Sequence, residues 1–410
     1  MDIDNLIVFC KYFRSVVNET ESPGRTRIIT FKDVLYCCMR MNGNSHSYSM
    51  TNLDMYIDDI IDVHDQALQQ KRDTVGYCPF KTICKELLNF VYKDNNTPRI
   101  IGVDGTYIPL SIELEKYGFR TSKKSTYCTG LISSLYDINE GVLINYRLCQ
   151  NNNERDGLKS QIKYLRPGDT LIMDRGYYSK DLLLFLTKME MKVIFRMKKS
   201  DLDVKEIIKN GQPSMRTKVD CNGEMVDFRI VTYKIDGISF FLGTNIMNHT
   251  VPYFQNLYWQ RWTVETNFRV SKYLLSLNNI LSKHPDRVRQ DIYTHNILFI
   301  IHAIFNNHLQ QSLPANKFVN TGNLFTVITN RILYPILYKK ITPSVKEMIE
   351  RICLGLLKTP VITKPGRHYK RVRITPVGKW YWCHIHEKQK INNIFNSLLP
   401  YRFVDYSKIV

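Results

Sequence analysis

Two apolar segments that each end near an aspartate constrain the fold more than any other feature of this sequence. Residues 99–110 and 169–174 contain runs of Ile, Val, Leu and Met, and they carry Asp104 and Asp174 respectively. Such runs predict buried strands in the centre of a sheet. Because a buried carboxylate is costly unless it is paired or bound to a cation, both aspartates need a partner.

The order of the predicted elements places both strands in one sheet. Further strands are predicted at 126–135, 141–148 and 193–197, and helices at 154–165 and 180–189. This order is typical of an α/β fold with a ribonuclease-H-like mixed sheet and flanking helices. Since open α/β sheets carry their sites at strand ends, we expect Asp104 and Asp174 to be neighbours. Asp169, in a Pro-Gly turn, is interpreted as ordinary turn chemistry.

Changes of pattern divide the chain into five predicted regions. Helical patterns precede the sheet, and β-like runs at 225–235 and 238–243, without a helical pattern, interrupt it. The N-terminal region is either a DNA-contacting domain or a structural cap. The regions are a helical N-terminal region (1–95), a ribonuclease-H-like core in two parts (96–200 and 251–312), a β-rich insertion between these parts (201–250) and a helical, basic C-terminal region (313–410).

The charge balance indicates a polyanionic partner. The chain has 57 Lys and Arg against 38 Asp and Glu, a net charge of +19, and binding phosphates releases condensed counterions. Residues 358–390 hold nine basic residues and one acidic residue among aromatic side chains, a composition that suits binding to the DNA backbone and bases. Nucleic acid is therefore the expected partner.

The ten cysteines have no disulfide-framework spacing, which predicts reduced thiols inside a cell. No apolar run reaches the length of a membrane span. Together these features predict an intracellular, reducing location.

A polar stripe follows a predicted helix at residues 258–272. At about 100° per residue, Arg261, Glu265 and Lys272 fall close to the direction of Tyr258. Taken alone, this spacing favours a solvated face with an ion pair between Arg261 and Glu265.

The rest of the chain supports a second interpretation through three motifs: Val103-Asp104-Gly105, Asp174-Arg175-Gly176-Tyr177 and Tyr258-x2-Arg261-x3-Glu265-x6-Lys272. Together they resemble the DDE transposases of bacterial cut-and-paste insertion sequences that carry a YREK signature. All four signature positions match without a change of spacing. The likeness runs from about residue 27 to residue 308, and residues 365–373 are similar to the basic C-terminal segment of those enzymes.

The resemblance implies that Asp104, Asp174 and Glu265 are the catalytic residues and the metal ligands. Phosphodiester cleavage and strand transfer use two divalent ions, expected here to be Mg²⁺, for which Mn²⁺ can substitute. Three close carboxylates would repel one another without such cations.

The resemblance also implies double-stranded DNA partners, namely transposon ends and target DNA, a homodimer in a synaptic complex, and a hairpin intermediate. The candidate DNA-binding and phosphate-binding residues are Tyr258, Arg261, Lys272, Arg175, Arg367, Lys370, Arg371 and Arg373. One departure concerns the insertion, which lacks the tryptophan that relatives stack on a flipped base. The substitutes considered, with no role assigned, are Phe228, Tyr233, Phe240 and Phe241.

Two alternatives stay open. One is a stand-alone metal-dependent nuclease on the same core, which cuts DNA without pairing two ends. The other is a domesticated DNA-binding protein that has lost its chemistry.

Overall fold

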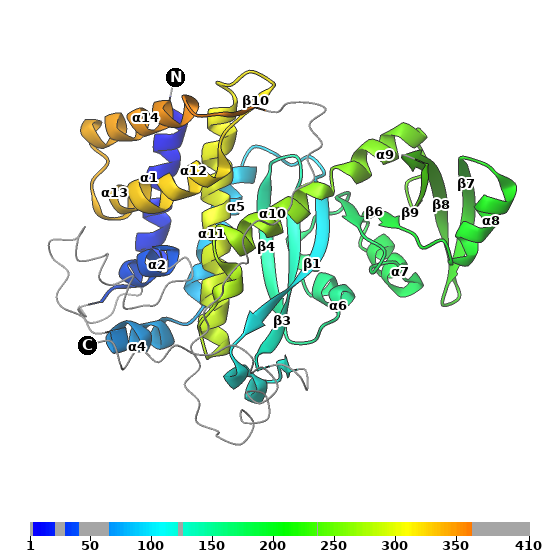
Figure 1. The fold of residues 1–410 in the computed structure, drawn as a ribbon, viewed down its shortest axis with the longest axis horizontal. Coiled ribbons are helices and arrows are strands. Elements are labelled where there is room, and N and C mark those ends of the chain that lie inside the picture. The colour runs from blue at the N-terminus through cyan, green and yellow to red at the C-terminus, as the bar shows by residue number, and fades with distance from the viewer. Residues whose placement is uncertain (1–2, 21–28, 41–64, 122–125, 236, 363–410) are drawn as a thin grey trace, which may run out of the picture. The chain divides into compact units, whose positions relative to one another are not determined.

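A large mixed β-sheet organises the fold (Figure 1). The computed structural model describes residues 3–20, 29–40, 65–121, 126–235 and 237–362. Within these residues the strands of this sheet are β1 (Ile100–Leu110), β2 (Arg120–Thr121), β3 (Cys128–Asp137), β4 (Val142–Cys149), β5 (Thr170–Met173), β6 (Lys192–Arg196), β7 (Ser214–Cys221), β8 (Glu224–Ile235) and β9 (Ile238–Thr244). Their order is β2-β3-β1-β5-β6-β9-β8-β7, and β4 also pairs with β3.

The register of the central strands decides where the two aspartates lie. β3 is antiparallel to both β1 and β4, whereas β5 runs parallel to β1 and to β6. Val103 on β1 pairs with Met173 on β5, so Asp104 and Asp174 come next along the two strands. The predicted α/β fold, a ribonuclease-H-like mixed sheet with flanking helices, is confirmed.

The strands of the predicted β-rich insertion continue this sheet, because β9 pairs with β6 and is followed by β8 and β7. The prediction of no helix in this region is wrong. A helix, α8 (Leu202–Asn210), buries Val204 and Ile207 and ends at Gly211, whose φ is 64°. So short a helix buries too few apolar residues to show a clear period. The predicted domain boundaries stay predictions.

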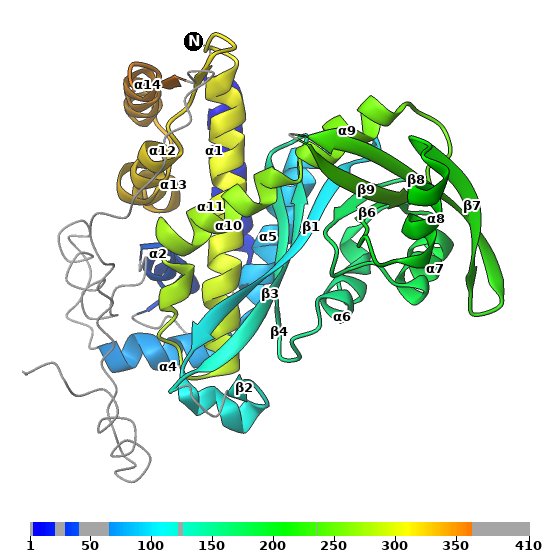
Figure 2. The same cartoon turned by 45° about the vertical axis from the view of Figure 1, so that its right-hand side comes forward.

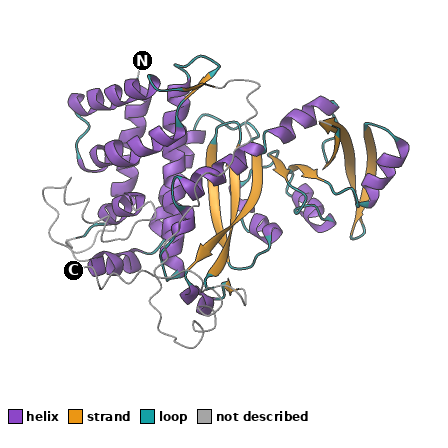
Figure 3. Cartoon of the chain, viewed as in Figure 1, coloured by secondary structure: helices purple, strands orange, loops and turns teal. Residues whose placement is uncertain are grey.

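Helices flank the sheet (Figure 3), and the long helix α11 contacts α1, α2, α5 and α12. Figures 1 and 2 both show α11 beside β4 and α5. No described helix has the length and apolar character of a membrane span. The other helices are α1 (Asp4–Thr20), α2 (Phe31–Arg40), α4 (Asp65–Val75), α5 (Cys78–Tyr92), α6 (Glu154–Lys159), α7 (Lys180–Lys188), α9 (Val251–Trp259), α10 (Trp262–Tyr273), α12 (Thr321–Val327), α13 (Leu333–Tyr338) and α14 (Pro343–Leu357), while α11 is Pro285–Gln310.

The helix predicted at 258–272 is two helices, α9 and α10. At their junction the backbone hydrogen bonds join residues three apart: the amide of Arg261 donates to Tyr258 (3.1 Å) and that of Val264 to Arg261 (3.0 Å). This tight turn places the Arg261 side chain inside the protein, where it is 4% exposed. The helix predicted at 154–165 is likewise shorter, with α6 followed by a separate 3-10 turn, Ile162–Tyr164.

A glycine allows α10 to approach the central strand. A Cβ on Gly102 of β1 would lie only 2.3 Å from the side chain of Val264 on α10. Because Gly102 has no side chain, Val264 packs directly on β1, and the residue that follows it, Glu265, is brought near Asp104.

Candidate active site

The central strands bring Asp104, Asp174 and a third charged residue, Arg196, to one part of the sheet. Asp174 directly follows β5, as predicted, and Arg196 ends β6. Asp104 lies within β1, which continues to Leu110, so the prediction of Asp104 at a strand end is wrong. β1 extends further because its pairing with β3 continues after its pairing with β5 has ended.

Arg261 connects the first aspartate to the signature glutamate. One guanidinium nitrogen, Nη1, lies 3.2 Å from Asp104 Oδ2, and the other, Nη2, lies 2.7 Å from Glu265 Oε1. The ion pair between Arg261 and Glu265 expected for a plain helix face is thus present. It is not a solvated surface pair, however, because the same buried arginine also binds Asp104.

Tyr258 and Arg196 contact the second aspartate. The Tyr258 hydroxyl donates to Asp174 Oδ1 at 3.3 Å, and Arg196 Nη1 lies 3.8 Å from the same oxygen. Burial raises the pKa of Tyr258 to about 12, so this hydroxyl keeps its proton and acts as a donor at neutral pH. Sequence reasoning missed Arg196, although its place at the end of a strand beside the Asp174 strand was a usable signal.

The carboxylate of Asp104 is not fully neutralised by its neighbours. Burial, followed by the charges of Glu154 and Asp174, raises the pKa of Asp104 to about 6, although Arg261 and the Gly105 amide oppose the shift. The amide donates to Asp104 Oδ1 at 2.8 Å. The cluster therefore has excess negative charge that a divalent cation would neutralise.

Among the described residues, no three His, Cys, Asp or Glu side chains lie close enough to coordinate one ion as they stand. Arg261 provides the positive charge between Asp104 and Glu265. Carboxylate oxygens are nevertheless the ligands that Mg²⁺ prefers, and Asp104 and Asp174 occupy adjacent register positions. The donor set therefore fits a divalent ion once Arg261 contacts another anion.

The remaining predicted site residues lie in different places. Lys272 is in the last turn of α10, and Arg175 is exposed in the turn after β5. Asp169, interpreted as a turn residue, is fully buried and forms a 2.6 Å ion pair with Arg99, so it also holds β5 to the start of β1. Four predicted DNA-binding residues fall outside the described residues: Arg367, Lys370, Arg371 and Arg373.

Two of the aromatic residues considered in the insertion are unavailable for stacking, because Phe228 and Phe241 are buried. Tyr233 and Phe240 are half-buried and stack on each other at 5.3 Å. The Arg196 guanidinium lies 4.9 Å from the Phe240 ring. This pair therefore borders the site through the arginine that faces Asp174.

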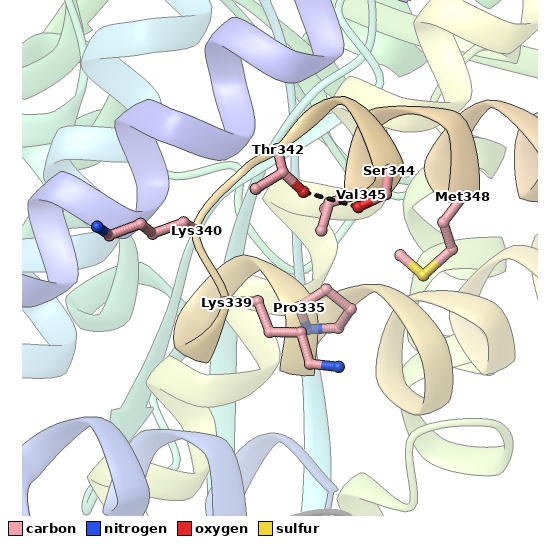
Figure 4. Close-up of a pocket in the computed structure, with 7 residues that line it drawn as sticks. All are labelled: Pro335, Lys339, Lys340, Thr342, Ser344, Val345 and Met348. Carbon is pink, nitrogen blue, oxygen red and sulfur yellow. Dashed lines mark hydrogen bonds between the residues drawn. The ribbon is translucent and has the colours of Figure 1, made fainter.

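A cavity of about 450 Å³ lies elsewhere, between α13 and α14, and contains none of these carboxylates (Figure 4). Thr342 and Ser344, at the start of α14, hydrogen-bond to each other there at 2.8 Å. The cavity provides no acidic group that could join the cluster.

The central sheet and its acidic residues fall within the segment that a family model recognises: the transposase DDE domain matches residues 95–301. The chain belongs to this family of DDE transposases. The transposase is therefore an enzyme that acts on DNA, cleaving and joining strands with the help of divalent metal ions. The sequence comparison with curated proteins gives no match.

Among solved structures, the transposase is similar to the piggyBac transposase in a synaptic complex with hairpin DNA. The TM-score is 0.45 and the sequence identity is 13%, over 88% of this chain and 83% of that chain.

Because the pKa of Asp104 is raised, we expect the stability of the metal-free protein to depend on pH. Between pH 3.8, its ordinary pKa, and about 6, the folded protein retains a proton on Asp104 that the unfolded chain releases. The free energy of unfolding should therefore decrease as the pH rises through this window. Urea unfolding in chelator should show this decrease for the wild type and a weaker one for Asp104→Asn. Equal slopes for the two proteins would contradict the assignment to Asp104.

Proposed function

We propose that this enzyme is a YREK-group transposase of a bacterial insertion sequence that excises its element through a DNA hairpin. The observation that supports this most strongly is the contact of the signature residues with both aspartates. Tyr258 binds Asp174, while Arg261 binds both Asp104 and Glu265. One tight turn between α9 and α10 thus connects the signature to two strands of the core.

We propose that Asp104, Asp174 and Glu265 hold two Mg²⁺ ions, for which Mn²⁺ can substitute. When bound, the ions would activate the attacking oxygen and stabilise the leaving oxygen of the scissile phosphate. Tyr258 orients Asp174 by donating to one of its oxygens, which leaves the other oxygen available as a ligand.

The basic side chains around the cluster suit contacts with DNA phosphates. Arg175 is exposed beside Asp174, Arg196 is 21% exposed, and Lys272 lies on the helix of Glu265. Phosphates of the DNA would offer Arg261 an alternative anion to the two carboxylates. The expected partners are transposon ends and target DNA, bound by a homodimer in the synaptic complex.

The hairpin step can be tested with Lys272→Ala. This variant should make the first nick at a labelled transposon end but form or resolve the hairpin slowly, because it removes a proposed contact to the non-cleaved strand without removing a carboxylate or its hydrogen-bond partner. Extruding a base from the DNA costs a few kcal/mol, which contacts to the DNA must offset. The loss of one such contact should therefore slow this step by roughly tenfold or more.

A time course that separates nicked, hairpin and released products gives the measurement. Lys346→Ala is the control, since Lys346 is a partly exposed lysine on α14 that pairs with Asp4 at 2.6 Å. If Lys272→Ala slows all three steps equally, Lys272 does not act on the hairpin.

Strand transfer distinguishes the transposase from the two alternatives. A stand-alone nuclease would cut the transposon end without joining it to target DNA, and a domesticated DNA-binding protein would do neither. Joining of a pre-cleaved end to a plasmid, by the wild-type protein in Mg²⁺, should be observed. Cleavage of an intact end without joining of the pre-cleaved end would favour the nuclease, and the absence of both reactions would favour the DNA-binding protein.

We also propose an intracellular, reducing location, in the bacterial cytoplasm or nucleoid or in the nucleus of a eukaryotic host. The nine cysteines within the described residues are all free, and most of them are buried. Free thiols are typical of reducing compartments.

A further inference from the structure

A glycine after each aspartate, Gly105 directly after Asp104 and Gly176 two residues after Asp174, leaves space for one glutamate. A Cβ on Gly105 would lie 2.6 Å from Glu154 Oε1, and a Cβ on Gly176 would lie 3.1 Å from Glu154 Oε2. Neither glycine has a positive φ, so the backbone conformation alone would permit other residues. The carboxylate of Glu154 lies between the two aspartate motifs and would have to shift if either glycine carried a side chain.

The first turn of α6 holds Glu154 in this position. The Asn153 side chain caps the helix by accepting from the Arg155 amide at 3.0 Å. The Arg155 guanidinium donates to the carbonyls of Gly176 (3.1 Å) and Tyr178 (2.9 Å). The start of α6 is therefore fixed to the turn that follows Asp174, and Glu154 faces the site because of this attachment.

In the described part of the chain, the Glu154 carboxylate has neither a hydrogen bond nor an ion pair. Burial, followed by the charge of Asp174, raises its pKa, and Arg155 only partly opposes this shift. Arg261 binds Asp104 and Glu265 but not Glu154. A half-buried carboxylate next to other carboxylates, without a bound cation, indicates a missing positive charge.

A buried hydroxyl without a partner points to the same place. Tyr177, in the turn after Asp174, is 1% exposed, and its hydroxyl has no hydrogen-bond partner among the residues that the structure describes. It lies close enough to Glu154 and Asp104 that their charges help burial to raise its pKa. Buried hydroxyls are nearly always satisfied, so this one indicates a ligand or a water molecule on a ligand.

We propose that Glu154 is a fourth carboxylate of the metal centre and binds a divalent cation together with Asp104 and Asp174 once Arg261 contacts another anion and releases Asp104. The Tyr177 hydroxyl then bonds to Glu154 or to a water molecule on the ion. This inference rests on the proposed function, because it takes Asp104 and Asp174 to be metal ligands. It also assigns a role to the glycines of both aspartate motifs, which make room for the fourth ligand.

The test is a titration of the full-length protein with Mn²⁺ into the millimolar range, followed by electron paramagnetic resonance. Glu154→Gln keeps the shape of the side chain and removes its charge. We expect it to weaken Mn²⁺ binding by about tenfold or more, with unfolding in chelator at the same or a higher urea concentration than the wild type. Asp156→Asn, an exposed change in the same helical turn, should bind Mn²⁺ like the wild type.

An unchanged Mn²⁺ isotherm for Glu154→Gln would overturn the proposal, as would a loss of stability in chelator without a loss of affinity. Asp104→Asn and Asp174→Asn, titrated in parallel, separate the two levels of inference. If they lose affinity and Glu154→Gln does not, only the fourth ligand is wrong. If none of the three loses affinity, the proposed metal centre is wrong as well.

A second variant tests the position of the carboxylate. The added Cβ of Gly105→Ala would displace the Glu154 side chain, because it would lie only 2.6 Å from Oε1. We expect weaker Mn²⁺ binding in the wild-type background and no further loss in the Glu154→Gln background. Equal losses in both backgrounds would show that Gly105 acts without Glu154 and would contradict the proposal.

Discussion

Asp104→Asn, Asp174→Asn and Glu265→Gln should each abolish cleavage of a transposon end while leaving binding to that end nearly intact. Each change removes a proposed metal ligand but no phosphate contact. A bound metal ion contributes several kcal/mol of transition-state stabilisation, so a loss of about a thousandfold or more in rate is expected. Nicking of a labelled end in Mg²⁺, with a gel shift on the same DNA, measures both properties.

The matched control is Asp227→Asn. Asp227 lies on β8, its side chain is 69% exposed, and it pairs with Lys218 at 3.8 Å, so its loss should change neither cleavage nor binding. Nicking near the wild-type rate in one of the three site variants would exclude that residue from the catalytic set.

Arg261→Ala should destabilise the metal-free protein more than any other single change to a basic residue near the site. The arginine side chain is 4% exposed and neutralises Asp104 and Glu265, which are 18% and 35% exposed. Removing one partner of a buried ion pair costs about 3–5 kcal/mol, and the partial exposure of Glu265 should place this change at the lower end. Urea unfolding in chelator measures the loss.

Divalent metal should reverse part of this loss. If Arg261 provides the charge that a cation otherwise provides, Mg²⁺ should stabilise Arg261→Ala more than it stabilises the wild type. Arg196→Ala is the comparison, because Arg196 is more exposed and lies 3.8 Å from Asp174, so its cost should be smaller. Equal stabilisation of Arg261→Ala and the wild type by Mg²⁺ would show that arginine and metal do not share a position.

The sequence was sufficient for the central strands and for the pairing of the two aspartates. The apolar runs around Asp104 and Asp174 are continuous, and the order of strands and helices leaves few topologies in which both strands are central. The signature spacing also predicted that Arg261 and Glu265 are neighbours. These features are local in the sequence or follow from the order of the elements along the chain, so the hydrophobic pattern is enough to predict them.

The tertiary structure alone decided which groups face the cluster. Arg261 turns inward at a break between α9 and α10 that no helix-breaking residue marks, because two partly exposed carboxylates, Asp104 and Glu265, bind its guanidinium. Arg196 and Glu154 reach the site from β6 and α6, elements whose side chains no periodic pattern directs toward Asp174. Contacts of this kind depend on packing between distant segments, such as Val264 on Gly102 and Glu154 between two glycines, and these distances exist only in the folded chain.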